Sequence, residues 1–203
     1  MKVDQLIFVA IVFLGMESCA SFKPTVASVS KKNEVIKKAI LDFSHTGEFK
    51  RGTVFSISFY DTLNKMVLKD LDVRNSEWVV GKFYTDIQAV SIIANDNKLL
   101  LPDSIKIGSM NKLPSQYMEI EGRLFYWWDD ETPLNQNVID VYKRYNLLVK
   151  NDLEGIIEIY DSKIGDTQKG VHYYFCKNDL SKYKRVITNI GVGYYDPPKL
   201  NCK

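Results

Sequence analysis

The sequence predicts an α+β fold, in which a largely antiparallel sheet is packed by two helices in a single domain. Segments with the two-residue period of a strand outnumber those with the period of a helix, and they follow one another in consecutive groups. The chain of 203 residues contains 12 Tyr and 10 Phe, an aromatic content that suits a β-rich interior. No repeat or low-complexity tract divides it, so one globular domain with a sizeable core is expected.

The first helix is predicted from Ser30 to about Ser44, because apolar residues recur there at helical spacing. Lysines and Asp42 lie mostly on the opposite side of the predicted helix. Ser30 is a suitable N-cap, and Gly47 is a suitable stop after the last turn. The apolar stripe consists of Val35, Ile36, Ala39, Ile40 and Phe43.

Strands are predicted where apolar residues alternate with polar ones between turn signals. The clearest is 54–60, where three apolar residues alternate with two serines. The Glu121-Gly122 step is a turn between two strands, and the run from Asp129 to Pro133 ends the second of them. The predicted strands are 54–60, 77–84, 87–94, 117–120, 123–128, a segment from Gly155 through Ile156, Ile157 and Ile159, 171–176 and 185–192.

A second helix is predicted from Asn135 to about Val149. Its buried stripe consists of Val138, Val141, Tyr142, Tyr145 and Leu148.

Residues 1–18 have the features of an export signal. Lys2 is the positive charge, and Leu6 to Met16 form a run of eleven uncharged, mostly apolar residues that stops at Glu17. A membrane-spanning helix needs about 20 such residues, so this run is too short to span and has the length of a signal core. We therefore expect 1–18 to be removed and the domain to work outside the cytoplasm.

Cys19 directly follows this run, in the order Met-Glu-Ser-Cys, which resembles the lipobox of bacterial lipoproteins. The resemblance implies cleavage before Cys19 and acylation of its thiol, which would anchor the protein to a membrane. Ordinary signal cleavage near Ser18 or Ala20 is the alternative, and Glu17 departs from the usual lipobox. The small and polar residues 19–30 are then a tether, and 31–203 form the domain.

The two remaining cysteines, Cys176 and Cys202, form an even pair in an oxidising compartment, so a disulfide between them is predicted. Two free thiols are the alternative. No cysteine or histidine spacing is typical of a metal site, and no phosphate-binding loop occurs, so neither a metal nor a cofactor is expected.

The charges are balanced. Removal of 1–18 leaves 26 basic and 23 acidic side chains, a net charge of about +3. This balance does not indicate a nucleic-acid-binding protein.

The segment 126–131 is the most suggestive candidate site, because aromatic rings lie beside carboxylates there. Trp127 and Trp128 are candidates for stacking a sugar ring, and Asp129 and Asp130 are candidate acid and base groups. Glu119, 10 residues before Asp129, is a further candidate. The alternative is ordinary strand alternation, with one Trp in the core, followed by a solvated turn.

His172 is the other catalytic candidate, since it is predicted on a strand where it could pair with a serine such as Ser58. No nucleophile-elbow motif surrounds the serines, so a packed histidine is the alternative.

The lipobox-like start, the segment 125–130 (Phe-Tyr-Trp-Trp-Asp-Asp) and the ending 194–198 (Tyr-Tyr-Asp-Pro-Pro) together resemble uncharacterised exported lipoproteins of Bacteroidota-type bacteria. The resemblance implies a location and no activity. We expect a non-enzymatic envelope protein, tethered on the non-cytoplasmic side of a membrane, that binds a protein or glycan or maintains the envelope. The alternative is a hydrolase or carbohydrate-active protein that uses 126–131 with His172 or Glu119.

Overall fold

The computed structural model describes residues 31–70, 76–95, 97–101, 113–161, 169–188 and 197–203, with side chains omitted at 65–70, 76–80 and 159–161. The predicted signal 1–18, the tether 19–30 with Cys19, and the end of the predicted strand 185–192 lie outside these residues. No helix in the described part of the chain is long and apolar enough to span a membrane.

The described chain contains three α-helices, one 3-10 helix and ten strands. The helices are α1 (Lys31–Ser44), η1 (Glu48–Arg51), α2 (Gln136–Arg144) and α3 (Leu153–Asp161). The strands are β1 (Val54–Tyr60), β2 (Leu63–Asp70), β3 (Ser76–Tyr84), β4 (Ile87–Ala94), β5 (Leu99–Leu100), β6 (Gln116–Ile120), β7 (Arg123–Trp127), β8 (Leu148–Val149), β9 (Gly170–Cys176) and β10 (Asp179–Thr188).

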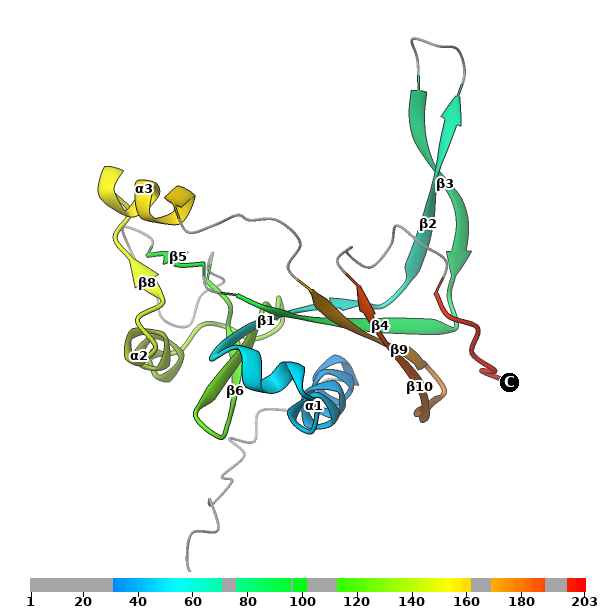
Figure 1. Ribbon diagram of the computed structural model, residues 1–203, viewed down its shortest axis with the longest axis horizontal. Helices are drawn as coiled ribbons and strands as arrows, with labels where there is room; N and C mark the ends of the chain where they lie inside the picture. Colours follow the sequence, from blue (N-terminus) through cyan, green and yellow to red (C-terminus); the bar gives the residue numbers. More distant parts are fainter. Residues whose placement is uncertain (1–30, 71–75, 96, 102–112, 162–168, 189–196) are drawn as a thin grey trace, which may run out of the picture.

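Six strands form the central sheet in the order β10-β9-β4-β1-β7-β6. Every neighbouring pair is antiparallel except β1 and β7, which are parallel. Strands β2 and β3 form a hairpin that projects away from the sheet, and the short parallel pair β5–β8 lies near α2 and α3 (Figure 1). The predicted α+β class and the largely antiparallel sheet are therefore confirmed.

Strand alternation divides the core between the two faces of the sheet. Helix α1 covers one face, where its predicted apolar stripe packs against residues of β1, β4, β7 and β9. Four phenylalanines form the centre of this cluster, with ring centroids 4.9 to 6.4 Å apart. They are Phe43, Phe49, Phe55 and Phe125. Helix α2 packs on the other face, against Leu124 and Tyr126 of β7.

Two predicted elements are wrong in part. The segment from Gly155 to Ile159 lies in helix α3 and is not a strand, because Asp152 caps a helix there: its carboxylate accepts from the backbone N–H of Gly155 at 2.8 Å. The fold therefore has three helices where two were predicted. Helix α2 ends at Arg144 and not at Val149, because Asn146 adopts a left-handed conformation, with φ of 51°, that ends the helix.

Strand β2 was not predicted, because Lys65 and Lys69 interrupt its apolar residues. The turn between β6 and β7 was predicted, and the structure contains it. Glu121 and Gly122 have φ of 48° and 72°, the conformation of the two-residue turn that matches the twist of a hairpin.

A disulfide joins Cys176 at the end of β9 to Cys202 near the chain terminus, as predicted. The Cα atoms are 5.3 Å apart, which is ordinary disulfide geometry. Both cysteines belong to a small apolar cluster with Leu63 and Tyr174, on the face of the sheet opposite to α1. The disulfide thus holds the C-terminal segment against the sheet.

We expect Cys176→Ala to lower the free energy of unfolding by about 3.5 kcal/mol, because the disulfide closes a loop with a sequence separation of 26 in the unfolded chain. Urea denaturation measures this difference. Cys202→Ala and the double variant should lose the same amount, since each removes the same bond. A midpoint unchanged by either substitution would show that the disulfide does not form.

Candidate functional site

The two tryptophans of the predicted aromatic site lie in different environments. Trp127 is 2% exposed in the α1 cluster, and its indole Nε1 donates to Asn33 Oδ1 at 2.9 Å. Trp128 is 45% exposed, and its ring meets Tyr126 edge-on at 5.9 Å. The two indoles therefore do not form one stacking surface.

Asp129 is buried, and its carboxylate accepts several hydrogen bonds. The donors are Thr132 Oγ1 at 2.9 Å, the backbone N–H of Glu131 at 3.3 Å, Asn33 Nδ2 at 3.3 Å and Gln116 Nε2 at 3.5 Å. Burial raises the pKa of Asp129, but the bonds from Thr132, Glu131 and Asn33 and the charge of Lys32 outweigh it, so the pKa lies below its ordinary value. This carboxylate is held ionised by the fold, whereas the neighbouring Asp130 is exposed.

Glu119 lies on the face of the sheet opposite to helix α1. Its carboxylate accepts from Arg144 Nη2 at 2.6 Å and from Tyr145 Oη at 2.9 Å, at the end of α2. Met118, the residue before it, belongs to the α1 cluster, as strand alternation requires. Asp129 accepts a hydrogen bond from Asn33 of α1, so its carboxylate lies on the α1 side of the sheet. The two candidate carboxylates are therefore on different sides of the sheet and are not brought together.

His172 is 1% exposed on β9, where it is in register with Ser91 of β4, which in turn is in register with Ser58 of β1. Its ring lies over Gly170: a Cβ at Gly170 would be 2.8 Å from the imidazole. The imidazole therefore fills the space that this glycine leaves, which agrees with a packed histidine. Among the described residues, no group of three or more His, Cys, Asp or Glu is placed to hold a metal ion.

An open groove lies between α1 and β10, with a volume of about 720 Å³, and we call it the α1–β10 groove. Leu41, which is 51% exposed, Leu180 and Tyr183 are its apolar and aromatic residues. The groove is lined by Glu34, Lys37, Lys38, Leu41, Asp42, His45, Leu180 and Tyr183. The sequence did not predict it as a site, because the two elements are far apart in the chain.

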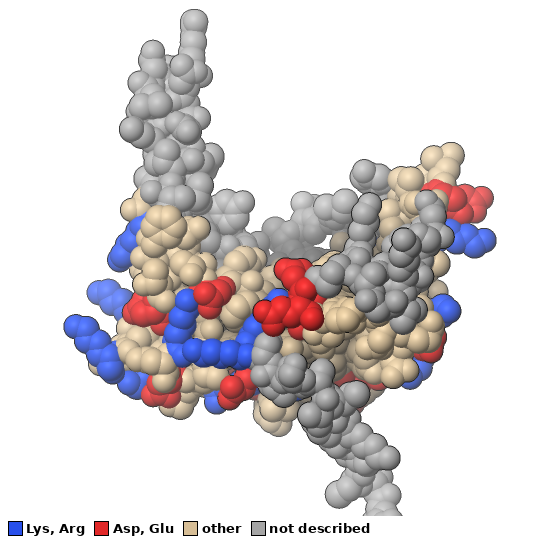
Figure 2. All heavy atoms as spheres, turned by 180° about the vertical axis from the view of Figure 1, so that it is seen from behind, with Lys and Arg blue, Asp and Glu red and all other residues tan. Residues whose placement is uncertain are grey.

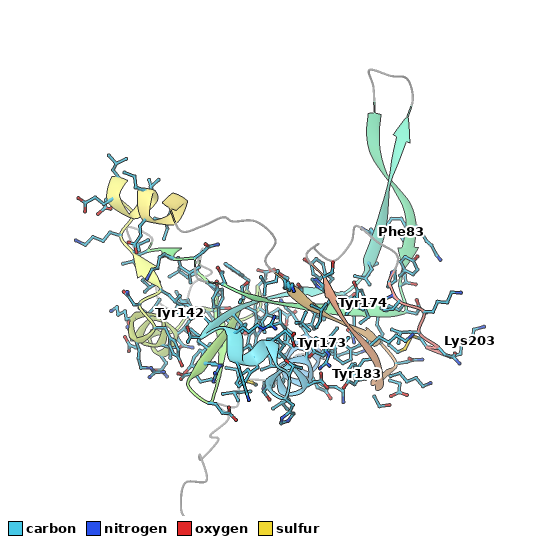
Figure 3. The ribbon with its side chains drawn as sticks, in the orientation of Figure 1. Phe83, Tyr142, Tyr173, Tyr174, Tyr183 and Lys203 are labelled. Atoms are coloured by element: carbon cyan, nitrogen blue, oxygen red, sulfur yellow. A yellow bond between two sulfur atoms is a disulfide. The ribbon has the colours of Figure 1, made fainter. Side chains whose placement is uncertain are left out.

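Asp42 joins α1 to the strands beneath it. It accepts from Tyr183 Oη at 2.5 Å, from Tyr173 Oη at 2.9 Å and from Arg185 Nη1 at 3.3 Å. Figure 3 shows Tyr173 and Tyr183 on the α1 side of the sheet and Tyr174 on the other, as the alternation along β9 requires. This network fixes the distance between the two walls of the α1–β10 groove.

The same hydrogen bonds also favour the ionised form of Asp42 at the groove. Burial raises the pKa of Asp42, but the hydrogen bonds from Tyr183 and Tyr173 and the positive charge of Arg185 outweigh it, so the pKa lies below its ordinary value. The hydrogen bond to Asp42 raises the pKa of Tyr183. Asp42 is thus an anion already compensated by Arg185, and the lysines remain as the cations that a ligand would meet.

Lys37 and Lys38 form no ion pair with any described residue, and the ammonium of Lys38 lies 6.0 Å from the ring centroid of Tyr183. On the side seen from behind, acidic and basic side chains are interspersed (Figure 2). An apolar floor with lysines beside it is chemically suited to binding a ligand that carries both apolar groups and carboxylates.

Comparisons with models of protein families, with curated proteins and with solved structures find no match to this chain.

We expect Asp42→Asn to lower the free energy of unfolding at pH 7 by about 1 kcal/mol, because charge-assisted hydrogen bonds from two tyrosines and Arg185 are weakened at a partly exposed site. Since the folded-state pKa is depressed, this contribution is present above the unfolded pKa and is lost as the pH falls through the folded pKa. The difference between the variant and the parent should therefore shrink below about pH 4.

Urea denaturation at several pH values measures this difference. Asp130→Asn is the matched control, since Asp130 is exposed and no such network holds it. An Asp42→Asn difference that stayed constant from pH 7 to about pH 2 would contradict the assignment.

Proposed function

We propose that this chain is an exported protein of the cell envelope, tethered to a membrane through a lipid on Cys19, whose folded domain binds a partner and does not catalyse a reaction. Residues 1–18 and the position of Cys19 support the location. The disulfide between Cys176 and Cys202 agrees with it, because such bonds persist in oxidising compartments.

The observation that carries the binding role is the placement of the candidate catalytic groups. Asp129 and Glu119 both accept hydrogen bonds within the fold, and they lie on opposite faces of the sheet. A pair of carboxylates acts as acid and base on one bond only when both flank it, about 5 to 10 Å apart on one cleft. By contrast, the α1–β10 groove offers an apolar floor and two lysines that form no ion pair with a described residue.

Mass spectrometry of the mature protein from its native host tests the tether. We expect residues 1–18 to be absent and Cys19 to be the acylated first residue, because the lipobox-like order precedes it. The Cys19→Ala variant should leave the membrane fraction, since acyl chains contribute about 0.8 kcal/mol per buried CH₂. An unmodified N-terminus near Ala20 would support a soluble exported protein and would contradict the tether.

Glycan binding by segment 126–131 is the second candidate, and the exposed indole of Trp128 supports it. If it holds, a glycan array should show binding that Trp128→Ala abolishes, because the sugar would lose its stacking surface. Phe83→Ala is a suitable control, since Phe83 is another exposed aromatic residue, at the base of the β2–β3 hairpin (Figure 3). Absence of binding to any glycan would rule this candidate out.

A further inference from the structure

Strand β10 is an edge of the central sheet. A register shift lies between Asp179 and Tyr183, and beyond it Tyr183 to Thr188 pair with β9 without interruption. In the described part of the chain, no strand pairs with the outer side of β10. From Tyr183 to Ile187, the outward backbone N–H and C=O groups of this edge have no partner among the described strands, and such groups can pair with a further strand.

The α1–β10 groove lies beside this edge. Strand alternation places Tyr183, Arg185 and Ile187 on the α1 side of β10, in register with residues of β9 that pack on that face. Lys184 is on the other side. A strand added to β10 would alternate in the same way, so every second side chain would face the α1 side. Leu41, which lines the groove, is 51% exposed there, and Ile187, farther along the same side of β10, is 46% exposed.

The charges at the edge favour an acidic partner. Arg185 is paired with Asp42 at 3.3 Å, and Lys182 lies 3.8 Å from Asp179. Lys184, on the side of β10 opposite to the groove, forms no ion pair within the described residues, so it is the cation that a carboxylate on that side would meet. In the groove, Lys37 and Lys38 also form no ion pair with a described residue, but Glu34 lies one turn before them on the same helix. Pairing of β10 with a second copy of itself would bring like charges together, which is a device that proteins use against self-association.

We propose that β10 and α1 bind an extended segment of a partner protein, which adds to β10 as a seventh strand and alternates apolar side chains with carboxylates. The apolar side chains lie in the α1–β10 groove against Leu41, Leu180 and Tyr183, and the carboxylates between them lie beside Lys184. Main-chain hydrogen bonds provide the affinity and the alternate side chains the specificity. This inference rests on the proposed binding function and names its partner class.

The Asp42 network prepares this edge for binding. It joins α1 to β9 and β10 through Tyr173, Tyr183 and Arg185, so the groove and the edge are held together before a ligand arrives. A preorganised site loses less conformational entropy on binding, which leaves more of the contact energy as affinity.

The test uses the full mature chain, which contains the domain from Lys31 to Lys203. Its ligands are synthetic peptides of about ten residues, the upper length of ordinary strands. The first peptide alternates Glu and Val. The second has the same composition with all Glu before all Val, and the third alternates Lys and Val. We expect the first peptide to bind in fluorescence anisotropy, and the other two to bind at least about tenfold more weakly, because they lose the alternation or the charge match.

Variants of the protein locate the bound peptide. Lys184→Glu and Leu41→Lys should each weaken binding of the first peptide by about tenfold, since one reverses the charge beside the edge and the other removes the apolar floor. Lys50→Glu is the matched control: Lys50 is an exposed lysine on η1, outside the groove, and its charge change is the same. Hydrogen exchange of the amides from Tyr183 to Thr188 should slow on binding, which a purely electrostatic contact would not cause.

Binding of the first peptide that is equally sensitive to Lys50→Glu and Lys184→Glu, or that leaves the β10 amides unprotected, would overturn the inference. The inference would also be overturned if the first peptide did not bind at all. A third contrary result would be that Lys184→Glu abolishes binding to anionic lipid vesicles but leaves binding of the peptide unchanged. None of these results bears on the acylation of Cys19 or on the placement of Asp129 and Glu119, which are tested separately. A failed peptide therefore overturns the partner class and leaves the proposed function standing.

Discussion

Helix α1 contacts the sheet along its length, and side-chain hydrogen bonds hold it near both ends. Near its start, Asn33 accepts from the indole of Trp127 and donates to Asp129. Near its end, Asp42 accepts from two tyrosines, one on β9 and one on β10. Phe43, the residue after Asp42, packs edge-on against the phenylalanines of β1 and β7, a geometry that aromatic rings favour. Because these partners come from both ends of the strand order, the sheet and the groove beside it depend on this one helix.

The same contacts decide which charges remain for a ligand. A buried carboxylate is costly unless donors surround it, so a fold that buries Asp129 must supply them, and Thr132, Asn33 and Gln116 do. Removing one donor would leave this buried charge less well solvated, so the hydrogen bonds to Asp129 stabilise the fold. Asp42 is compensated in the same way by Arg185. At the groove, Lys37 and Lys38 form no ion pair with a described residue, and they lie near the edge strand β10.

The local sequence pattern was sufficient to predict an element where one face of that element is apolar. It predicts α1 and β1 with nearly the observed bounds, because apolar and polar residues recur there at a single period. It also predicts the bounds of β4, although this strand is buried on both faces. It fails at Gly155 to Ile159, where the isoleucines favour a strand but the cap at Asp152 starts a helix. The groove could not be predicted, since Asp42 and Tyr183 are 141 residues apart and nothing near either residue identifies the other. Only the tertiary packing of α1 on the sheet brings them together.

The position of α1 in the chain connects the groove to the proposed tether. The helix begins at Lys31, directly after the predicted tether 19–30, whose twelve residues span at most about 40 Å when extended. A lipid on Cys19 would therefore keep the groove within about one domain diameter of the membrane surface. An anionic membrane surface would compete with the carboxylates of the proposed peptide for Lys184. A partner held at that membrane would gain from a high effective concentration, so a weak strand contact would be sufficient for occupancy. The proposed tether and the proposed edge-strand site would thus act together in binding one partner.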